Sequence, residues 1–146
     1  MSQDERKIGF QLKSVNNMIR RKLDMEFAEA GIEDIVGMQG PMIGYIYDKS
    51  KEHDVLQPDL EKEFSIRRST ATVMLQNLEQ KGFVVREPVE YDARLKKIVL
   101  TQKAIQRYME IRLRIDAFNR ILEKDITKEE KEQFFLILDK IMRNLE

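Results

Sequence analysis

Hydrophobic residues recur at steps of three and four along the first part of the chain, a spacing that places them on one face of a helix. The first series spans a helix of about 20 residues and consists of Ile8, Leu12, Val15, Ile19, Leu23 and Phe27. Gly31 follows the series and is expected to end this helix. Two shorter helices are predicted next, with Pro41 and Pro58 in their first turns, where proline is tolerated.

A helix predicted over residues 67–81 has two faces of different character. The positions that point to the core share the i, i+3, i+4, i+7 spacing and are Ala71, Met74, Leu75 and Leu78. The positions that point away are mostly polar and uncharged, and are Ser69, Thr70, Thr72, Val73, Gln76, Asn77 and Gln80. Such an outward face suits a helix that lies against the edges of DNA bases, although a helix face that is only solvated has a similar composition.

Beyond Gly82 the pattern changes to the alternation that is typical of strands. Two strands are predicted over residues 83–87 and 96–100, joined by a charged tip in which Pro88 blocks further pairing. Thr101 is expected to cap the helix that follows. These elements predict a mostly α fold with a small β-hairpin, in the order of a winged helix-turn-helix.

The same region resembles the MarR family of bacterial transcription regulators. The residues that carry the resemblance fit the family's polar recognition helix and its D-x-R and L-T wing pattern, and are Ser69, Thr70, Leu78, Asp92, Arg94, Leu100 and Thr101. The resemblance covers most of the chain and is specific over about residues 56–101. It implies one domain, residues 1–146, in which a winged helix-turn-helix at 40–101 is flanked by dimerisation helices at 1–30 and 102–146.

Composition narrows the class of protein. The charged content of 36%, the mean hydropathy of −0.51 and the lack of a long apolar run predict no membrane span, and a cytoplasmic protein is expected. With no Cys and one His, the chain offers a poor set of metal ligands, so no metal and no cofactor are predicted. His53, between Glu52 and Asp54, is interpreted as an exposed loop residue. No catalytic motif is present, so an enzyme is not expected.

Charge is balanced over the whole chain but not along it. The formal net charge is zero, which alone argues against a DNA-binding protein. Residues 65–97, however, contain seven basic and four acidic groups, a local charge of +3 that leaves −3 for the rest. The excess of positive charge coincides with the predicted recognition helix and wing. Residues 52–63 are acidic and would repel DNA, so an alternative function is a winged-helix module that binds protein instead of DNA.

Candidate DNA contacts lie on the recognition helix and the wing. Polar side chains of the outward face are expected to bond to base edges, Val73 to touch a thymine methyl, and the arginines that start the helix to bind phosphate. Arg94 is expected in the minor groove, held by Asp92 through a charge-assisted hydrogen bond. The resemblance supports this pair and adds Gln57 as a phosphate contact. The full set is Gln57, Arg67, Arg68, Ser69, Thr70, Thr72, Val73, Gln76, Asp92, Arg94 and Lys96.

The last helix predicts a second copy of the chain as a partner. It begins at the capping box Thr127-Lys128-Glu129-Glu130 and carries apolar residues on more than one face. This excess of apolar surface favours a homodimer, whose two recognition helices would lie about one turn apart on a pseudo-palindromic operator in double-stranded DNA. The candidate dimerisation residues are Ile8, Leu12, Phe134, Leu138, Ile141 and Leu145.

The resemblance also implies repression that ends when a small aromatic or apolar effector binds between the first helices and the recognition helix. Methionine and tyrosine are concentrated in those first helices, and methionine-rich surfaces adapt to varied apolar ligands. The candidate ligand contacts are Met18, Met42 and Tyr45, for which packing in the core is the alternative explanation.

Overall fold

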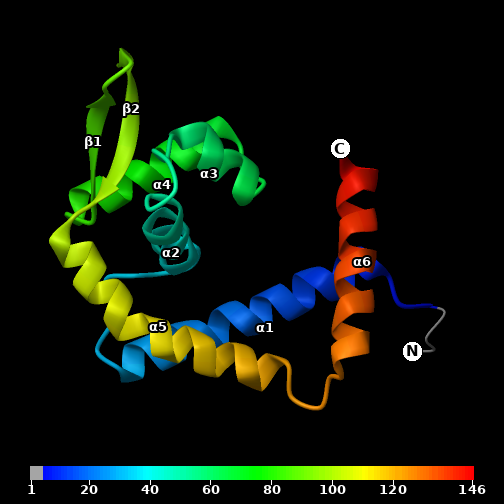
Figure 1. The fold of residues 1–146 in the computed structure, drawn as a ribbon. Coiled ribbons are helices and arrows are strands. Elements are labelled where there is room, and N and C mark those ends of the chain that lie inside the picture. Colours follow the sequence, from blue (N-terminus) through cyan, green and yellow to red (C-terminus); the bar gives the residue numbers. More distant parts are fainter. Residues whose placement is uncertain (1–4) are drawn as a thin grey trace. The chain divides into compact units, whose positions relative to one another are not determined.

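The computed structural model describes residues 5–146 (Figure 1). Its contacts divide the chain into two compact units, Met1–Arg114 and Ile115–Glu146. The boundary falls inside a helix that is continuous across it. The single domain expected from the sequence stays a prediction.

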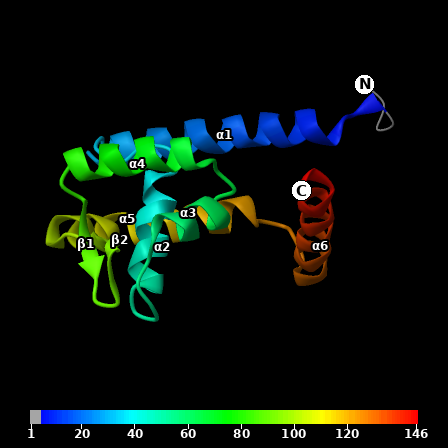
Figure 2. The same cartoon turned by 90° about the horizontal axis from the view of Figure 1, so that it is seen from above.

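The described chain is mostly helical and contains one antiparallel hairpin, so the predicted fold class is confirmed. The elements are α1 (Ile8–Glu29), α2 (Gln39–Lys49), α3 (Gln57–Glu63), α4 (Arg68–Gln80), β1 (Val84–Val89), β2 (Asp92–Leu100), α5 (Gln102–Leu122) and α6 (Lys128–Leu145). The predicted recognition helix is α4. Figure 1 shows the hairpin extending from the end of α4 past α3 as an arm, and Figure 2 shows its two strands side by side in a second view.

Glycine ends the first and the fourth helix, as the sequence predicts. Gly31 follows α1 with φ +74° and Gly82 follows α4 with φ +76°, a left-handed backbone that glycine adopts without steric cost. The turn at Gly82 lets the N–H of Phe83 donate to the carbonyl of Leu78 at 2.9 Å, which satisfies one of the last carbonyls of α4. Phe83 is fully buried, so the end of α4 and the start of the hairpin are fixed together.

The inward face of α4 packs as its spacing predicts. Ala71, Leu75 and Leu78 are fully buried, and Met74 is half-buried. Other buried side chains of this unit come from α2, α3, the hairpin and the loop before α3, and include Met42, Ile43, Ile46, Val55, Leu60, Phe83, Val84 and Ile98. The core therefore takes one side of α4 and leaves the other side available to a partner.

The hairpin is longer than the sequence predicts. β1 runs to Val89, β2 begins at Asp92, and Pro88 pairs with Lys96 instead of blocking the ladder. Proline is tolerated here because β1 is an edge strand with a partner on one side only. The register shifts directly after Pro88, so residues 93–95 have no partner on β1 and bulge near the tip. This bulge contains the arginine that was expected in the minor groove.

Further hydrogen bonds attach the base of the hairpin to the helices. The N–H of Ile98 donates to the carbonyl of Val55 at 2.7 Å, which joins β2 to the loop between α2 and α3. The Thr101 hydroxyl donates to the Gly82 carbonyl at 2.6 Å and accepts the N–H of Ala104 at 3.2 Å. The predicted cap of α5 is therefore confirmed, and the base of the hairpin is fixed relative to the end of α4.

In the unit Ile115–Glu146, the capping box predicted for the last helix is confirmed. The N–H of Glu130 donates to the Thr127 hydroxyl at 3.1 Å, and the N–H of Thr127 donates to the Glu130 carboxylate at 2.9 Å. These bonds lower the pKa of the Glu130 carboxyl. No residue of α6 is buried.

Candidate nucleic-acid interface

The outward face of α4 is exposed to solvent. Ser69, Thr70 and Gln76 are exposed, and Val73 adds an aliphatic side chain that is 56% exposed. The N-cap residue Arg67 makes no side-chain cap bond, so the N–H groups of the first turn keep their capacity to bind an anion. This face combines donors, acceptors and one apolar group, which is the chemistry that base edges in the major groove require.

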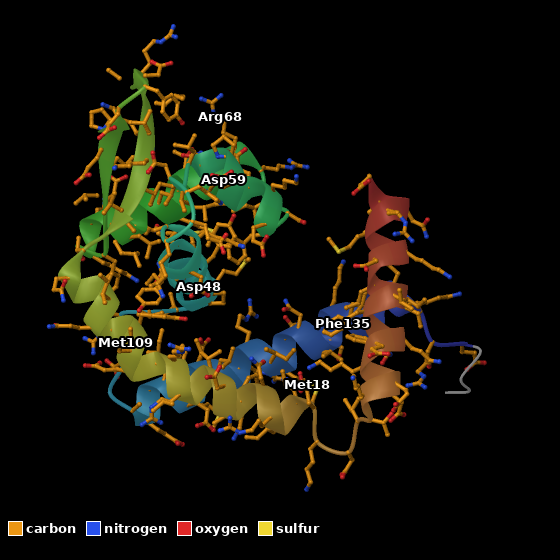
Figure 3. The ribbon with its side chains drawn as sticks, viewed as in Figure 1. Met18, Asp48, Asp59, Arg68, Met109 and Phe135 are labelled. Carbon is orange, nitrogen blue, oxygen red and sulfur yellow. The ribbon has the colours of Figure 1, made fainter. Side chains whose placement is uncertain are left out.

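A groove of about 600 Å³ lies between the start of α4 and the hairpin, and we call it the basic groove. It is lined by Leu56, Gln57, Pro58, Glu61, Arg68, Thr72, Arg86, Arg94, Leu95 and Lys96. Four of these side chains are basic and one is acidic, so the groove favours an anion. Figure 3 shows Arg68 pointing outward from the protein. A DNA phosphate has the charge that this arrangement favours.

The tip of the hairpin holds one guanidinium in a defined position. Asp92 accepts hydrogen bonds from Nε and Nη2 of Arg94, both at 3.1 Å, and from the Arg94 N–H at 2.9 Å. These bonds stabilise the charged carboxylate and so hold the pKa of Asp92 below its ordinary value. The Arg94 side chain is nevertheless 90% exposed, so it remains open to a partner. The charge-assisted pair predicted from the sequence is confirmed.

Gln57, which was expected at a phosphate, bonds to α4. Its Nε2 donates to the Thr72 hydroxyl at 3.0 Å and to the carbonyl of Arg68 at 3.3 Å. The Thr72 hydroxyl donates to the same carbonyl at 2.9 Å, so its hydrogen is already used within the protein. Both side chains therefore support the first turns of α4. The DNA contacts expected of them stay predictions.

Several basic groups of the recognition region are engaged within the chain. Lys81 donates to the loop between α1 and α2, Arg86 pairs with Glu79 of α4, and Nζ of Lys97 lies 3.9 Å from a carboxylate oxygen of Asp54. The basic DNA-binding candidates that form no ion pair with the described residues 5–146 are Arg67, Arg68 and Lys96. The cations left for phosphate therefore lie at the start of α4 and on the hairpin.

Acidic residues around α3 have structural partners. Asp59 accepts the N–H of Leu56 at 2.8 Å and so caps the start of α3. Nδ1 of His53 lies 2.9 Å from the carbonyl oxygen of Asp54.

Within residues 5–146, no three His, Cys, Asp or Glu side chains are grouped so that they could hold a metal ion. Over the same residues, no helix has the length and apolar character that crossing a membrane requires.

The three predicted ligand contacts differ in exposure. Met42 is fully buried, as core packing requires, whereas Met18 is 60% exposed on α1. Tyr45 is half-buried against Phe64, with ring centroids 5.9 Å apart, and burial raises its pKa. Their role stays a prediction.

A second groove, of about 460 Å³, lies beside α1, and we call it the α1 groove. It is lined by Asn16, Ile19, Arg20, Leu23, Asp24, Phe27, Gly37, Met38 and Pro41. This groove could not be predicted from the sequence, because its loop residues meet α1 only in the folded chain. Its walls are mostly apolar, which is typical of sites for small molecules.

The predicted dimerisation residues have different exposures in the single chain. Ile8, Leu12, Phe134 and Leu145 are exposed, and Leu138 and Ile141 are half-buried. Leu145 reaches 82%. Their role in dimerisation stays a prediction.

The known proteins that are similar to this chain are regulators of transcription. The sequence profile of the MarR family matches residues 33–95, which contain α2, α3, α4 and part of the hairpin. YybA, an HTH-type transcriptional regulator of Bacillus subtilis (strain 168), is 26% identical over 129 residues, which are 88% of this chain and 85% of that protein.

Solved structures share the fold over nearly the whole chain. The transcription regulator MarR from Oenococcus oeni PSU-1 is 34% identical, with a TM-score of 0.80 over 94% of this chain and 99% of that one. MepR of S. aureus, solved in complex with DNA, has a TM-score of 0.86 at 24% identity, over 99% of this chain and 100% of that one. The similarity therefore includes the flanking helices as well as the winged part.

Proposed function

The chain belongs to the MarR family of DNA-binding transcription regulators, and we propose that it is a homodimeric cytoplasmic repressor that leaves its operator when a small ligand binds. Proteins of this family regulate transcription and are not enzymes. The observation that carries the proposal is the exposed face of α4 beside the basic groove of about 600 Å³.

In this proposal α4 lies in the major groove and the hairpin reaches the adjacent minor groove. Ser69 and Gln76 bond to base edges, and Val73 contacts a thymine methyl. Arg94 enters the minor groove, where negative potential attracts a guanidinium. The sugar-phosphate backbone that separates the two DNA grooves then passes the basic groove, between α4 and the hairpin. Four basic side chains line that groove, so its charge fits the phosphates.

Two copies are proposed to bind one operator. None of the residues of α6 is buried within the single chain, although the helix carries several large apolar side chains. Covering apolar surface contributes roughly 25 cal/mol per Å², so a second copy that packs against α6 stabilises both chains. A two-fold dimer presents two α4 helices to a pseudo-palindromic sequence.

The effector is proposed to bind in the α1 groove of about 460 Å³. Ile19, Leu23 and Phe27 give apolar contacts, and Arg20 and Asp24 give charged partners at the same site. A small aromatic or apolar compound with one polar group fits this combination. Its binding releases the operator if it favours a separation of the two α4 helices that no longer matches the DNA.

Selection of duplexes from a random pool by the full chain tests the proposal. We expect a pseudo-palindromic sequence to be enriched, and its affinity to fall steeply as the salt concentration rises, because bound phosphates release counterions. Sedimentation at micromolar concentration should give a dimer. Failure to enrich any sequence would contradict the proposal and would favour the module that binds protein.

A further inference from the structure

Lys81 follows the last residue of α4 and reaches the loop between α1 and α2. Its Nζ donates to the carbonyl of Asp34 and to Oε1 of Gln39, each at 2.9 Å. The same Oε1 accepts the N–H of Val36 at 3.1 Å. Gln39 is only 7% exposed, so these bonds satisfy a polar group that solvent hardly reaches.

Two residues of α5 form hydrogen bonds to the residues that this contact joins, Asp34 and Lys81. Nη2 of Arg107 donates to Oδ2 of Asp34 at 3.1 Å, which keeps the loop attached to α5. Nζ of Lys103 donates to the carbonyl of Lys81 at 2.7 Å, where a cation offsets the partial negative charge at the end of α4. The end of α4 is therefore attached, through a side chain and through the backbone, to two elements that are distant in the sequence.

Its bonds and its position distinguish Lys81 from the cations that line the basic groove. Two of the three ammonium donors of Lys81 are used by groups of the protein. Lys81 follows the end of α4, whereas Arg68 begins it, so the two residues lie roughly 20 Å apart along the helix axis. Arg68 lines the basic groove and Lys81 does not.

We propose that Lys81 and Gln39 are positioning residues for operator recognition, which set the direction of α4 without touching DNA. The proposal rests on the proposed function, because it concerns how α4 meets the bases. Gln57 holds the start of α4, and the Lys81 side chain and the bond from Lys103 hold its end. Loss of the Lys81 contact weakens the attachment of that end, and the helix can then tilt about its start. A tilt disturbs hydrogen bonds to base edges more than contacts with phosphate, because base contacts require close alignment.

Variants of the full chain test this role. Lys81→Met removes the donors but keeps the length of the side chain, and Gln39→Leu removes the acceptor. Gln39→Glu keeps a carboxylate oxygen that can accept in place of Oε1 and is the conservative variant. The matched control is Lys96→Met, which removes a cation that lines the basic groove. Fluorescence anisotropy gives the Kd for the duplex that the unchanged chain selects and for a scrambled duplex, at several salt concentrations.

We expect Lys81→Met and Gln39→Leu each to weaken binding of the selected duplex about tenfold, as loss of a partly buried, charged hydrogen bond implies. The Kd for the scrambled duplex and the slope of log Kd against log salt should not change, because no phosphate contact is lost. Gln39→Glu should bind the selected duplex as the unchanged chain does. Lys96→Met should weaken both duplexes and reduce the slope by about one.

Equal losses of Lys81→Met on both duplexes, with a slope reduced by about one, would make Lys81 a phosphate contact and overturn the proposal. Unchanged affinity for the selected duplex would overturn it as well. If circular dichroism shows that Lys81→Met does not fold, the comparison of Gln39→Leu with Gln39→Glu decides by the same criteria. If the unchanged chain selects no duplex, the proposed function fails and this proposal fails with it. If only the positioning role is wrong, the unchanged chain still selects a duplex.

Discussion

The carboxylate of Asp92 holds the guanidinium of Arg94 through two hydrogen bonds of 3.1 Å, while 90% of the Arg94 side chain stays exposed. An acidic group beside DNA ordinarily weakens binding, because it repels phosphate. Here it orients a long cation before binding, so less side-chain entropy remains to be lost when DNA is bound. In the proposed complex with DNA, we therefore expect the pair to make an acidic residue favourable to binding.

Asp92→Ala should weaken operator binding about fivefold, although it removes a negative charge, because Arg94 is no longer oriented. Glu90→Ala is the matched control, since Glu90 is exposed at the same tip and carries the same charge. The control should keep or raise the affinity. Anisotropy titrations measure both variants, and an affinity of Asp92→Ala equal to or above that of the unchanged chain would contradict the positioning of Arg94.

Arg94→Ala should lower the affinity for every duplex and reduce the slope of log Kd against log salt by about one, because one charge near the DNA backbone is lost. Arg112→Ala serves as the control, since Arg112 is an exposed cation of α5 that does not line the basic groove. A slope that stays the same in Arg94→Ala would show that the hairpin does not contact DNA.

The pKa of the Asp92 carboxyl should lie below its ordinary value of 3.8, and Arg94→Ala should return it toward that value. A carboxyl with a lowered folded pKa contributes stability above its unfolded pKa and loses it as the pH falls through the folded pKa. The pair should therefore stay intact throughout the neutral range and break only in acid. A carbon-13 NMR titration of the carboxyl checks this, and a pKa at or above 3.8 would contradict the pair in solution.

Gln76→Ala should reduce the preference for the selected operator by roughly 1–3 kcal/mol and leave binding to random duplexes nearly unchanged, because a base contact carries sequence information. Gln106→Ala, which removes an exposed glutamine of α5, is the control. Competition between selected and random duplexes measures the preference. Equal losses on both duplexes would remove Gln76 from the residues that read the sequence.

The fold could be predicted where it depends on neighbours in the sequence. Gly82 ends α4, and Thr101 caps α5 through the N–H three residues later. The extent of the hairpin could not be predicted, because the effect of Pro88 depends on whether its strand is an edge.

The candidate site, like the fold, could be predicted only where it depends on residues that are close in the sequence. The outward face of α4 and the bond between Asp92 and Arg94 follow from spacing within one element. The bond from Lys81 to Gln39 joins residues 42 positions apart, and the bond from Gln57 to Thr72 joins residues 15 apart. No periodic pattern marks such pairs, so the sequence shows the charge of Lys81 but not its partner.

Dimerisation determines whether the proposed repression is possible, because a single α4 helix reads too little DNA for tight and specific binding. The last helix, α6, has no buried residue, and its exposed apolar side chains are Phe134, Phe135, Leu136, Ile137, Met142 and Leu145. Removal of residues 128–146 should therefore give a monomer that has lost tight operator binding. Sedimentation and anisotropy measure the two properties on the same samples.

Point variants separate loss of the dimer from loss of the fold. Phe134→Asp and Leu145→Asp should each weaken the dimer, because a charge placed in an apolar interface must be desolvated without a partner. Lys140→Asp adds an acidic group at another exposed position of α6 and is the control. Far-UV circular dichroism should remain unchanged in all three. A full chain that sediments as a monomer at micromolar concentration and still binds a palindromic operator tightly would contradict the dimeric mechanism.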